Sequence, residues 1–427
     1  MRQSGYSYER KECLYSTSVA KFNSFRDFGY LEGRSALLTE PGKLIADTFC
    51  LKDVSLAFDL LGSVEKLQRR NQDYKLLETI KRVGVQNYSL LARLTGLNAE
   101  TIRYKVNRHL AKLGLSITID VNYGQLGLTM GYLTVKPNGA SGKSWADRMS
   151  YVIFAGKKMG SNSHFCLTAV PFRLKKKYID SLEQLKTEKL IEDYEYKELY
   201  WMRYPPFRPE FYDFDERVWK VDWNRFETTM SEIGPSFLDV NRDSEVDYID
   251  LKILSSMMKD PTMPLAKTAK EIRVNPRTVR YHHSEHVMKN GFILGNNIRW
   301  VKPLQENNPS GVMQAVVLSK RLDETGMTKV RKFCNSLPFT WLEAGTEDRT
   351  YLAVVDIPMQ DLQTCIQQIE IHLQGAGDSY EVTVLDTSRS RPLTIPEEMF
   401  EPKRGWRLYT AGETSSQRTQ GQTGNEE

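Results

Sequence analysis

The side chains best suited to chemistry in this 427-residue chain lie in two short segments with helical spacing. In the first segment, Ile102, Val106 and Leu110 recur at i, i+4 and i+8, so they share one face of a helix. The opposite face then presents polar residues, which are Glu100, Arg103, Tyr104, Asn107, Arg108 and Lys112. The second segment presents Arg277, Arg280, Tyr281 and Ser284 in the same way.

These residue types match the groups that DNA exposes in its major groove. Arginine donates two hydrogen bonds to guanine and asparagine pairs with adenine, whereas a lysine such as Lys112 reaches the phosphates. The pattern predicts binding to double-stranded DNA. For any single residue the alternative is a solvated helix face, and Arg103 and Arg280 could instead hold a shared structural bond. In the second segment, Glu285 stands at the position of Arg108 in the first. This difference predicts that the second segment binds DNA more weakly.

Histidines cluster in the second segment. His282 and His286 have the i, i+4 spacing of two metal ligands on one helix, but no glutamate or cysteine stands out as a further ligand. His283 falls at a core-facing position. His286 and its equivalent His109 lie near the helix end, where a positive charge suits the helix dipole. We therefore expect structural histidines and no metal.

An aromatic stretch at residues 200–223 could stack on bases, but the interleaved acids Glu210, Asp213, Asp215 and Glu216 repel phosphate. Packing or an interdomain arm is the favoured interpretation. The chain has no nucleophile elbow, P-loop, GxGxxG fingerprint or HExxH motif. We therefore expect no catalytic residues and no cofactor, and we interpret the chain as a non-enzyme.

An internal repeat organises the elements that hold these segments. The tetrapeptide at 101–104 (TIRY) recurs at 278–281 (TVRY), an offset of 177 residues. The same offset holds without a gap from Lys75 and Lys252 to Gly114 and Gly291. A register kept over this length indicates a duplication.

Each copy predicts three helices followed by an extended wing. The third helix begins at Asn98 or Asn275, whose side chain caps it, and ends at Gly114 or Gly291. The expected first helices are 74–83 and 248–259, the second helices 89–95 and 265–272, and the wings 115–121 and 292–300.

Alternating apolar segments behind each unit predict a ferredoxin-like βαββαβ sandwich. In the first copy we expect strands at 126–135, 165–170 and 195–202 and helices at 144–152 and 174–190. In the second copy we expect strands at 312–319, 339–343, 350–356 and 380–385 and helices at 324–336 and 359–373. The fold class is α+β, with two winged helix-turn-helix units each followed by a ferredoxin-like domain.

These elements divide the chain into seven expected parts. They are a partly helical extension (1–70, with helical spacing at 43–67), winged unit 1 (71–123), sandwich 1 with the aromatic arm (124–224), a linker (225–246), winged unit 2 (247–301), sandwich 2 (302–410) and a disordered tail (411–427).

Composition is that of an ordinary globular protein, with 40% hydrophobic and 26% charged residues. The net charge of +5 permits an anionic partner without requiring one. The five cysteines show no CxxC spacing, which favours reduced thiols. No signal peptide and no apolar run of about 20 residues is present, so we expect a cytoplasmic protein without a membrane partner.

The chain resembles the Lrp/AsnC family of prokaryotic, especially archaeal, transcription regulators. Residues 247–254 (DYIDLKIL) match the family's opening pattern, 91–98 (LARLTGLN) resemble its turn, and 291–293 (GFI) match its closing pattern. The resemblance implies a RAM/ACT-like sandwich that mediates dimerisation and senses an amino acid or other small metabolite. Gly345 and Asp348 fit the family's G-x-x-D effector motif, which the first copy lacks.

The family has one such unit per chain and dimerises, so the tandem arrangement implies an intramolecular pseudo-dimer, with further homo-oligomers open. Two alternatives to a DNA-binding regulator remain. Siroheme decarboxylases resemble this architecture, although only His164 and His372 lie in the sandwich regions here. The other alternative is an interaction module without DNA binding.

Overall fold

The computed structural model describes residues 31–32, 37–38, 72–139, 145–205, 208–214, 216, 218–223, 240, 245–300, 311–391 and 393–408. Two compact units are present: residues 1–77 with 214–216, and the rest of the chain. In the first unit, β1 (Leu31–Glu32) pairs with β2 (Leu37–Leu38). The expected helix at 43–67 and the tail at 411–427 lie outside the described residues.

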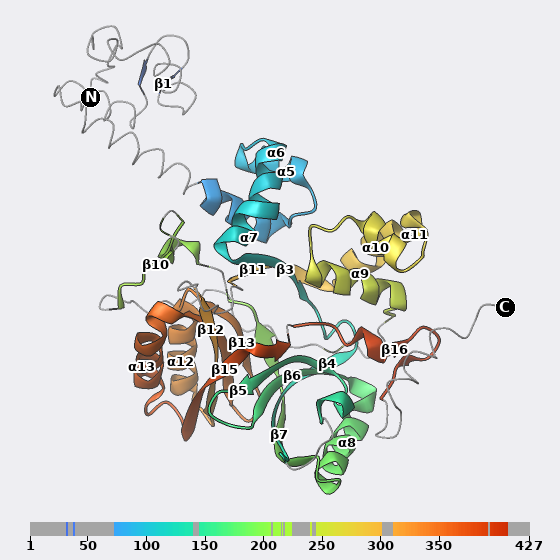
Figure 1. Ribbon diagram of the computed structural model, residues 1–427, viewed down its shortest axis with the longest axis vertical. Helices are drawn as coiled ribbons and strands as arrows, with labels where there is room; N and C mark the ends of the chain where they lie inside the picture. The colour runs from blue at the N-terminus through green and yellow to red at the C-terminus, as the bar shows by residue number, and fades with distance from the viewer. Residues whose placement is uncertain are drawn as a thin grey trace. The chain divides into compact units, whose positions relative to one another are not determined.

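Two helix-turn-helix units are present (Figure 1). The second compact unit contains the whole of one of them and the other from residue 78 onward. In the first copy, α5 (Tyr88–Thr95) leads to a third helix built from α6 (Ala99–Tyr104), a π-helical segment (Lys105–His109) and α7 (Leu110–Leu113). The helix before them covers residues 72–83. The second copy has α9 (Tyr248–Lys259), α10 (Leu265–Glu271), α11 (Pro276–Tyr281) and a second π-helical segment (His282–Met288). These elements confirm the six predicted helices to within about two residues at each end.

The two extended segments behind the helical units do not form separate wings. β3 (Leu115–Val121) and β11 (Ile293–Trp300) pair with each other in an antiparallel two-stranded sheet. The prediction of a wing for each unit is therefore wrong. Each segment contributes one strand, and the other strand that satisfies its backbone groups comes from the other repeat.

One sheet of nine strands unites the two sandwich regions (Figure 1). Its order is β7-β4-β6-β5-β15-β12-β14-β13-β8. The strands of the first copy are β4 (Leu128–Pro137), β5 (Val152–Lys158), β6 (His164–Pro171), β7 (Ile191–Glu198) and β8 (Trp201–Arg203). Those of the second are β12 (Val312–Lys320), β13 (Thr340–Gly345), β14 (Tyr351–Pro358) and β15 (Ser379–Arg391).

Within each copy the first four strands in chain order lie as 4-1-3-2, the order of a ferredoxin-like sheet. The second copy follows the predicted βαββαβ sequence, with α12 (Glu324–Ser336) and α13 (Leu362–Leu373). In the first copy α8 (Lys175–Thr187) confirms one helix. The predicted helix at 144–152 is wrong, because only the 3-10 turn Ala146–Arg148 forms there. The helical backbone ends at Met149, which is already extended with a ψ of 115°, and β5 begins at Val152.

The two halves of the sheet are joined at two places. β5 pairs with β15, and β8 crosses to pair with β13. Between β7 and β8 the backbone N–H of Leu199 donates to Met130 in β4, and that of Tyr200 donates to Gly345 in β13. The edges of the sheet are therefore continuous, and the repeats form the expected intramolecular pair.

Apolar side chains of both repeats share a core inside this sheet. Phe154 in β5 and Trp341 in β13 contact edge to face, with ring centroids 6.2 Å apart. On the outer face of the first half, Tyr178 and Leu182 of α8 are buried against Cys166 and neighbouring residues. Cys166, Cys334 and Cys365 are buried free thiols, as expected.

The aromatic segment after β8 packs against the second repeat. Tyr204 stacks on Trp341, Trp219 contacts Phe339 at 5.3 Å between ring centroids, and Trp223 Nε1 donates to Asp361. These contacts confirm the packing interpretation. Among the described helices, none is both long and apolar enough to span a membrane.

Candidate nucleic-acid interface

The first recognition helix is set by its caps and by its apolar face. Gly96 has a φ of 77° in the turn after α5, and the Asn98 side chain accepts a 2.7 Å hydrogen bond from the backbone of Thr101. The side chains of Ile102 and Leu110 are at most 1% exposed, so the opposite face of the helix points outward. All six predicted contact residues are exposed on that face: Glu100, Arg103, Tyr104, Asn107, Arg108 and Lys112.

Arg103 is exposed but already has partners in its own helical unit. Its guanidinium forms an ion pair with Glu100 and lies 5.7 Å from the centre of the Tyr88 ring. The second copy has Arg277 at the position of Glu100, so this pair cannot form there. A bond from Arg103 to Glu100 is therefore not a feature that both repeats share.

The second recognition helix presents the same kind of face. Asn275 accepts from the backbone of Arg277, and Pro276 occupies the first turn, where its missing N–H costs nothing. The predicted residues Arg277, Arg280, Tyr281 and Ser284 are all exposed. The Ser284 hydroxyl donates to the carbonyl of Arg280, so it can offer only its lone pairs to a ligand. Glu285 forms an ion pair with Lys289 one turn along the helix.

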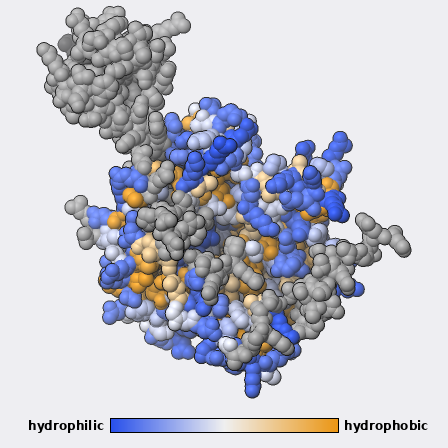
Figure 2. Space-filling model, viewed as in Figure 1, coloured by the Kyte–Doolittle hydropathy of each residue, from blue (hydrophilic) through white to orange (hydrophobic). Residues whose placement is uncertain are grey.

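Hydrophilic residues gather over α5–α6 and over α10–α11 (Figure 2). Both recognition helices change to π-helical hydrogen bonding halfway along, at Lys105 and at His282. Single turns of π-helix are rare and occur often at functional sites.

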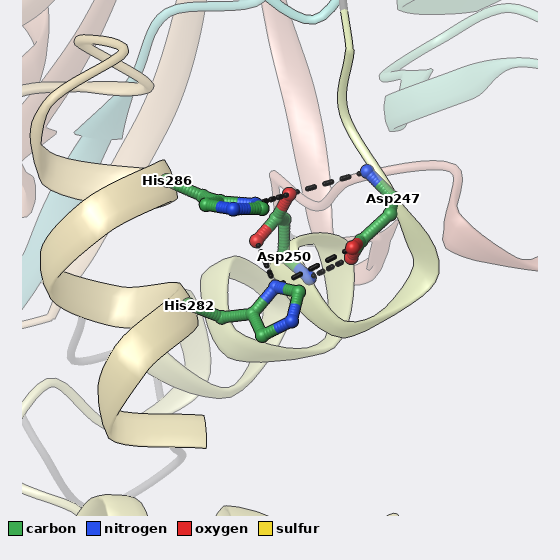
Figure 3. A group of neighbouring side chains, drawn as sticks. All are labelled: Asp247, Asp250, His282 and His286. Carbon is green, nitrogen blue, oxygen red and sulfur yellow. Dashed lines mark hydrogen bonds and ion pairs between the residues drawn. The ribbon is translucent and has the colours of Figure 1, made fainter. Parts of the chain in front are cut away.

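The histidines of the second helix have partners that the sequence did not reveal. His282 Nδ1 lies 2.9 Å from Asp250 Oδ1, and His286 Nδ1 lies 3.4 Å from Asp250 Oδ2 (Figure 3). Asp250 is fully buried in α9, and burial raises the pKa of its carboxyl. These contacts join the first helix of the unit to its recognition helix. His283 is half-buried, and burial lowers the pKa of its imidazole.

The predicted effector residues lie at the end of β13, in the case of Gly345, and in the turn between β13 and β14, in the case of Asp348. A Cβ at Gly345 would clash with the indole of Trp201, so the close approach of β8 requires glycine there. Asp348 forms a 2.7 Å ion pair with Lys197 of the first repeat. Hydrogen bonds from Lys197 and from the Thr346 hydroxyl lower the pKa of Asp348 to about 2. Both residues thus have roles in the contact between the repeats.

A group of charged side chains lies where the β3–β11 ribbon meets the second half of the sheet. Arg299 forms a 3.1 Å ion pair with Asp356, and its guanidinium lies 3.6 Å from the centre of the Trp341 ring. Burial raises the pKa of Asp120 to about 7. A hydrogen bond from Asn297 and the positive charges of Lys81 and Arg299 act in the opposite direction and lower this pKa. The sequence gives no signal for this group, because its charged members come from four separate elements: the helix at 72–83, β3, β11 and β14.

Asp120 should make the protein less stable as the pH rises. The folded chain keeps its proton between pH 4 and pH 7, whereas the unfolded chain loses it near pH 4. The contribution of Asp120 to the free energy of unfolding is therefore fully present below pH 4. It is lost as the pH rises towards 7, by at most about 1.4 kcal/mol per pH unit. We expect Asp120→Asn to remove this loss in urea unfolding at pH 5 and pH 8. Asp180→Asn, on the exposed face of α8, is the control, and parallel pH profiles for Asp120→Asn and the wild type would contradict the assignment.

No protein-family model matches the chain, and a search of curated proteins finds no match. Among solved structures, the siroheme decarboxylase NirDL, in complex with an iron-uroporphyrin III analogue, is similar with a TM-score of 0.46 and 11% identity. The match covers 76% of this chain and 94% of NirDL. An AsnC-family transcriptional regulatory protein from Pyrococcus furiosus matches with a TM-score of 0.25 and 16% identity, over 33% of this chain and 90% of its own.

E. coli AsnC matches with a TM-score of 0.23 and 19% identity, over 33% of this chain and 91% of its own. The chain is structurally similar to Lrp/AsnC regulators and to NirDL.

Proposed function

We propose that the chain is a sequence-specific DNA-binding transcription regulator of the Lrp/AsnC type. The observation that supports this most is the outward polar face of both recognition helices, each at the end of a helix-turn-helix held by its own caps. A recognition helix presented in this way fits the major groove with its amino end towards the bases. The shared sheet holds the two units in one chain, as dimerisation does for regulators with one unit per chain.

Charge distribution gives independent support. Residues 88–113 carry five basic and one acidic side chains, and the equivalent residues 265–290 carry six and two. Each segment therefore has a net charge of +4, although the whole chain has only +5. The rest of the chain is slightly acidic, so positive charge is concentrated in the segments that would face phosphates.

Binding should depend steeply on salt. If roughly six of these cations contact phosphates, the logarithm of the association constant falls against log salt with a slope of about −5, because counterions are released. Genomic fragments retained by the protein should first be selected, and affinity for one of them then measured by fluorescence anisotropy across salt concentrations. A slope near zero, or the absence of any retained fragment, would count against the proposal.

In this proposal the sandwich regions hold the repeats together and bind a small-molecule effector. We assign Asp348 to the contact between the repeats, because its carboxylate already pairs with Lys197. An effector would then bind elsewhere on these regions.

A second candidate is an enzyme of the siroheme-decarboxylase type. The observation that favours it is Asp120, whose pKa near 7 suits acid–base chemistry and which lies near the buried hydroxyls of Tyr123 and Tyr204. His372 in the second sandwich region gives it no support, because its ring stacks on Phe333 and bonds the carbonyl of Gln368. A tetrapyrrole absorption spectrum in protein that retains no DNA fragment would favour the enzyme.

A further inference from the structure

We propose that the second helix-turn-helix unit contains a site for one divalent transition-metal ion of the Zn²⁺ type, formed by Asp247, Asp250, His282 and His286. Two carboxylates from the start of α9 and two imidazoles from the recognition helix point toward one another there (Figure 3). Imidazole and carboxylate are ordinary Zn²⁺ ligands, and four of them complete a closed structural site.

The spacing of the four donor atoms suits a tetrahedral ion. One donor atom of each residue lies within 4.8 Å of all the others. His282 Nδ1 is 2.9 Å from Asp250 Oδ1 and 3.4 Å from Asp247 Oδ2, and His286 Nδ1 is 3.4 Å from Asp250 Oδ2. Ligands at Zn²⁺ bond lengths of about 2.0–2.2 Å stand roughly 3.3–3.6 Å apart in a tetrahedron. An ion can therefore enter with small side-chain adjustments.

The charges also balance. Two ionised carboxylates and two neutral imidazoles neutralise a divalent cation. Asp250 has no exposed surface, and the side chain of His282 is only 11% exposed, so ionised groups here depend on each other rather than on water. A metal ion would satisfy a buried carboxylate more fully than an imidazole does.

The surrounding backbone holds the ligands in place. Asp247 and Asp250 form a capping box, in which Asp247 Oδ1 accepts from the backbone N–H of Asp250 and Asp250 Oδ2 accepts from that of Asp247. Asp247 Oδ2 then faces His282. Ligands fixed by second contacts lose little entropy when an ion binds.

The first repeat does not carry the same four ligands. At the 177-residue offset, Arg70 stands in place of Asp247 and Lys105 in place of His282, while Asp73 and His109 match Asp250 and His286. The proposal therefore predicts one ion per chain, bound in the second repeat.

The test is titration of untagged, full-length protein with Co²⁺ and with Zn²⁺ in the absence of DNA. We expect one Co²⁺ per chain with the intense visible absorption of tetrahedral coordination, displacement of Co²⁺ by Zn²⁺, and a Zn²⁺-dependent rise in Tm. Asp247→Asn, which keeps the helix cap, and His286→Gln, which changes a partly exposed residue, should each weaken binding at least tenfold.

His109→Gln, at the equivalent position of the first repeat, is the matched control and should bind Co²⁺ as the wild type does. Circular dichroism of the metal-free variants separates lost ligands from lost folding. The proposal is overturned if the folded wild type binds no Co²⁺ at equimolar concentration. It is equally overturned if Asp247→Asn and His286→Gln bind as tightly as the control.

Discussion

Glu343→Ala should lower the free energy of unfolding by about 3–5 kcal/mol, because it leaves buried cations without their counter-charge. Glu343 in β13 is fully buried and accepts hydrogen bonds from Arg203 in β8, Asn335 and Tyr351. Arg331 also pairs with it, at 3.3 Å. Without this carboxylate, the guanidinium groups of Arg203 and Arg331 lose their counter-charge. The side chain of Arg203 is itself buried.

The effect should be measured by urea unfolding followed by fluorescence of the tryptophans, including Trp201, which lies under the Arg331 guanidinium. Glu347→Ala, four residues away and exposed, is the control and should change stability by less than about 0.5 kcal/mol. Glu343→Gln keeps the shape and removes only the charge, so it should have an intermediate effect. If Glu343→Ala were as stable as the control, this ion-pair network would not hold β8 against the second repeat.

Local signals explain why the helical units could be predicted closely. Capping residues and apolar spacing act within a few residues, so α9 and β3 have the bounds that the sequence predicted. The polar faces of both recognition helices follow from the same spacing. A buried Ile102 turns Arg103 and Tyr104 away from the core of the unit, and both are exposed.

Pairing between repeats could not be predicted in this way. β3 finds its partner β11 far along the chain, and β8 crosses from the end of the first repeat to β13. Nothing in the composition of a strand identifies which edge it will join. The prediction of a wing for each unit was therefore wrong. In the same way, the G-x-x-D motif did not indicate that Asp348 would pair with Lys197.

The metal-type cluster was missed for a related reason. His282 and Asp250 are 32 residues apart, and no glutamate or cysteine stands out beside the histidines as a further ligand. The aspartates were visible in the opening pattern DYIDLKIL. The first and third helices of a helix-turn-helix unit pack together, so that pattern together with the i, i+4 histidines was a signal that could have found the cluster.

Arg103→Ala and Arg280→Ala should each weaken binding to a selected DNA site by about tenfold to a hundredfold, or about 1–3 kcal/mol, if each arginine reads a base. The two residues belong to different recognition helices and share no contact in the described residues, so the double variant should lose roughly the product of the two factors. Affinity for unrelated DNA should fall much less, because most phosphate contacts remain. Anisotropy at one fixed salt concentration, with specific and unrelated duplexes, measures both quantities.

Lys177→Ala is the matched control, since it removes one exposed positive charge from α8, outside both recognition helices. It should leave both affinities unchanged. Stability should also be unchanged within about 0.5 kcal/mol in all three single variants, because each side chain is exposed. If the double variant kept wild-type preference for the selected site, the recognition helices would not read sequence. Equal losses on specific and unrelated DNA would instead assign both arginines to phosphate contacts, and readout would then have to come from Asn107, Arg108 or Arg277 on the same faces.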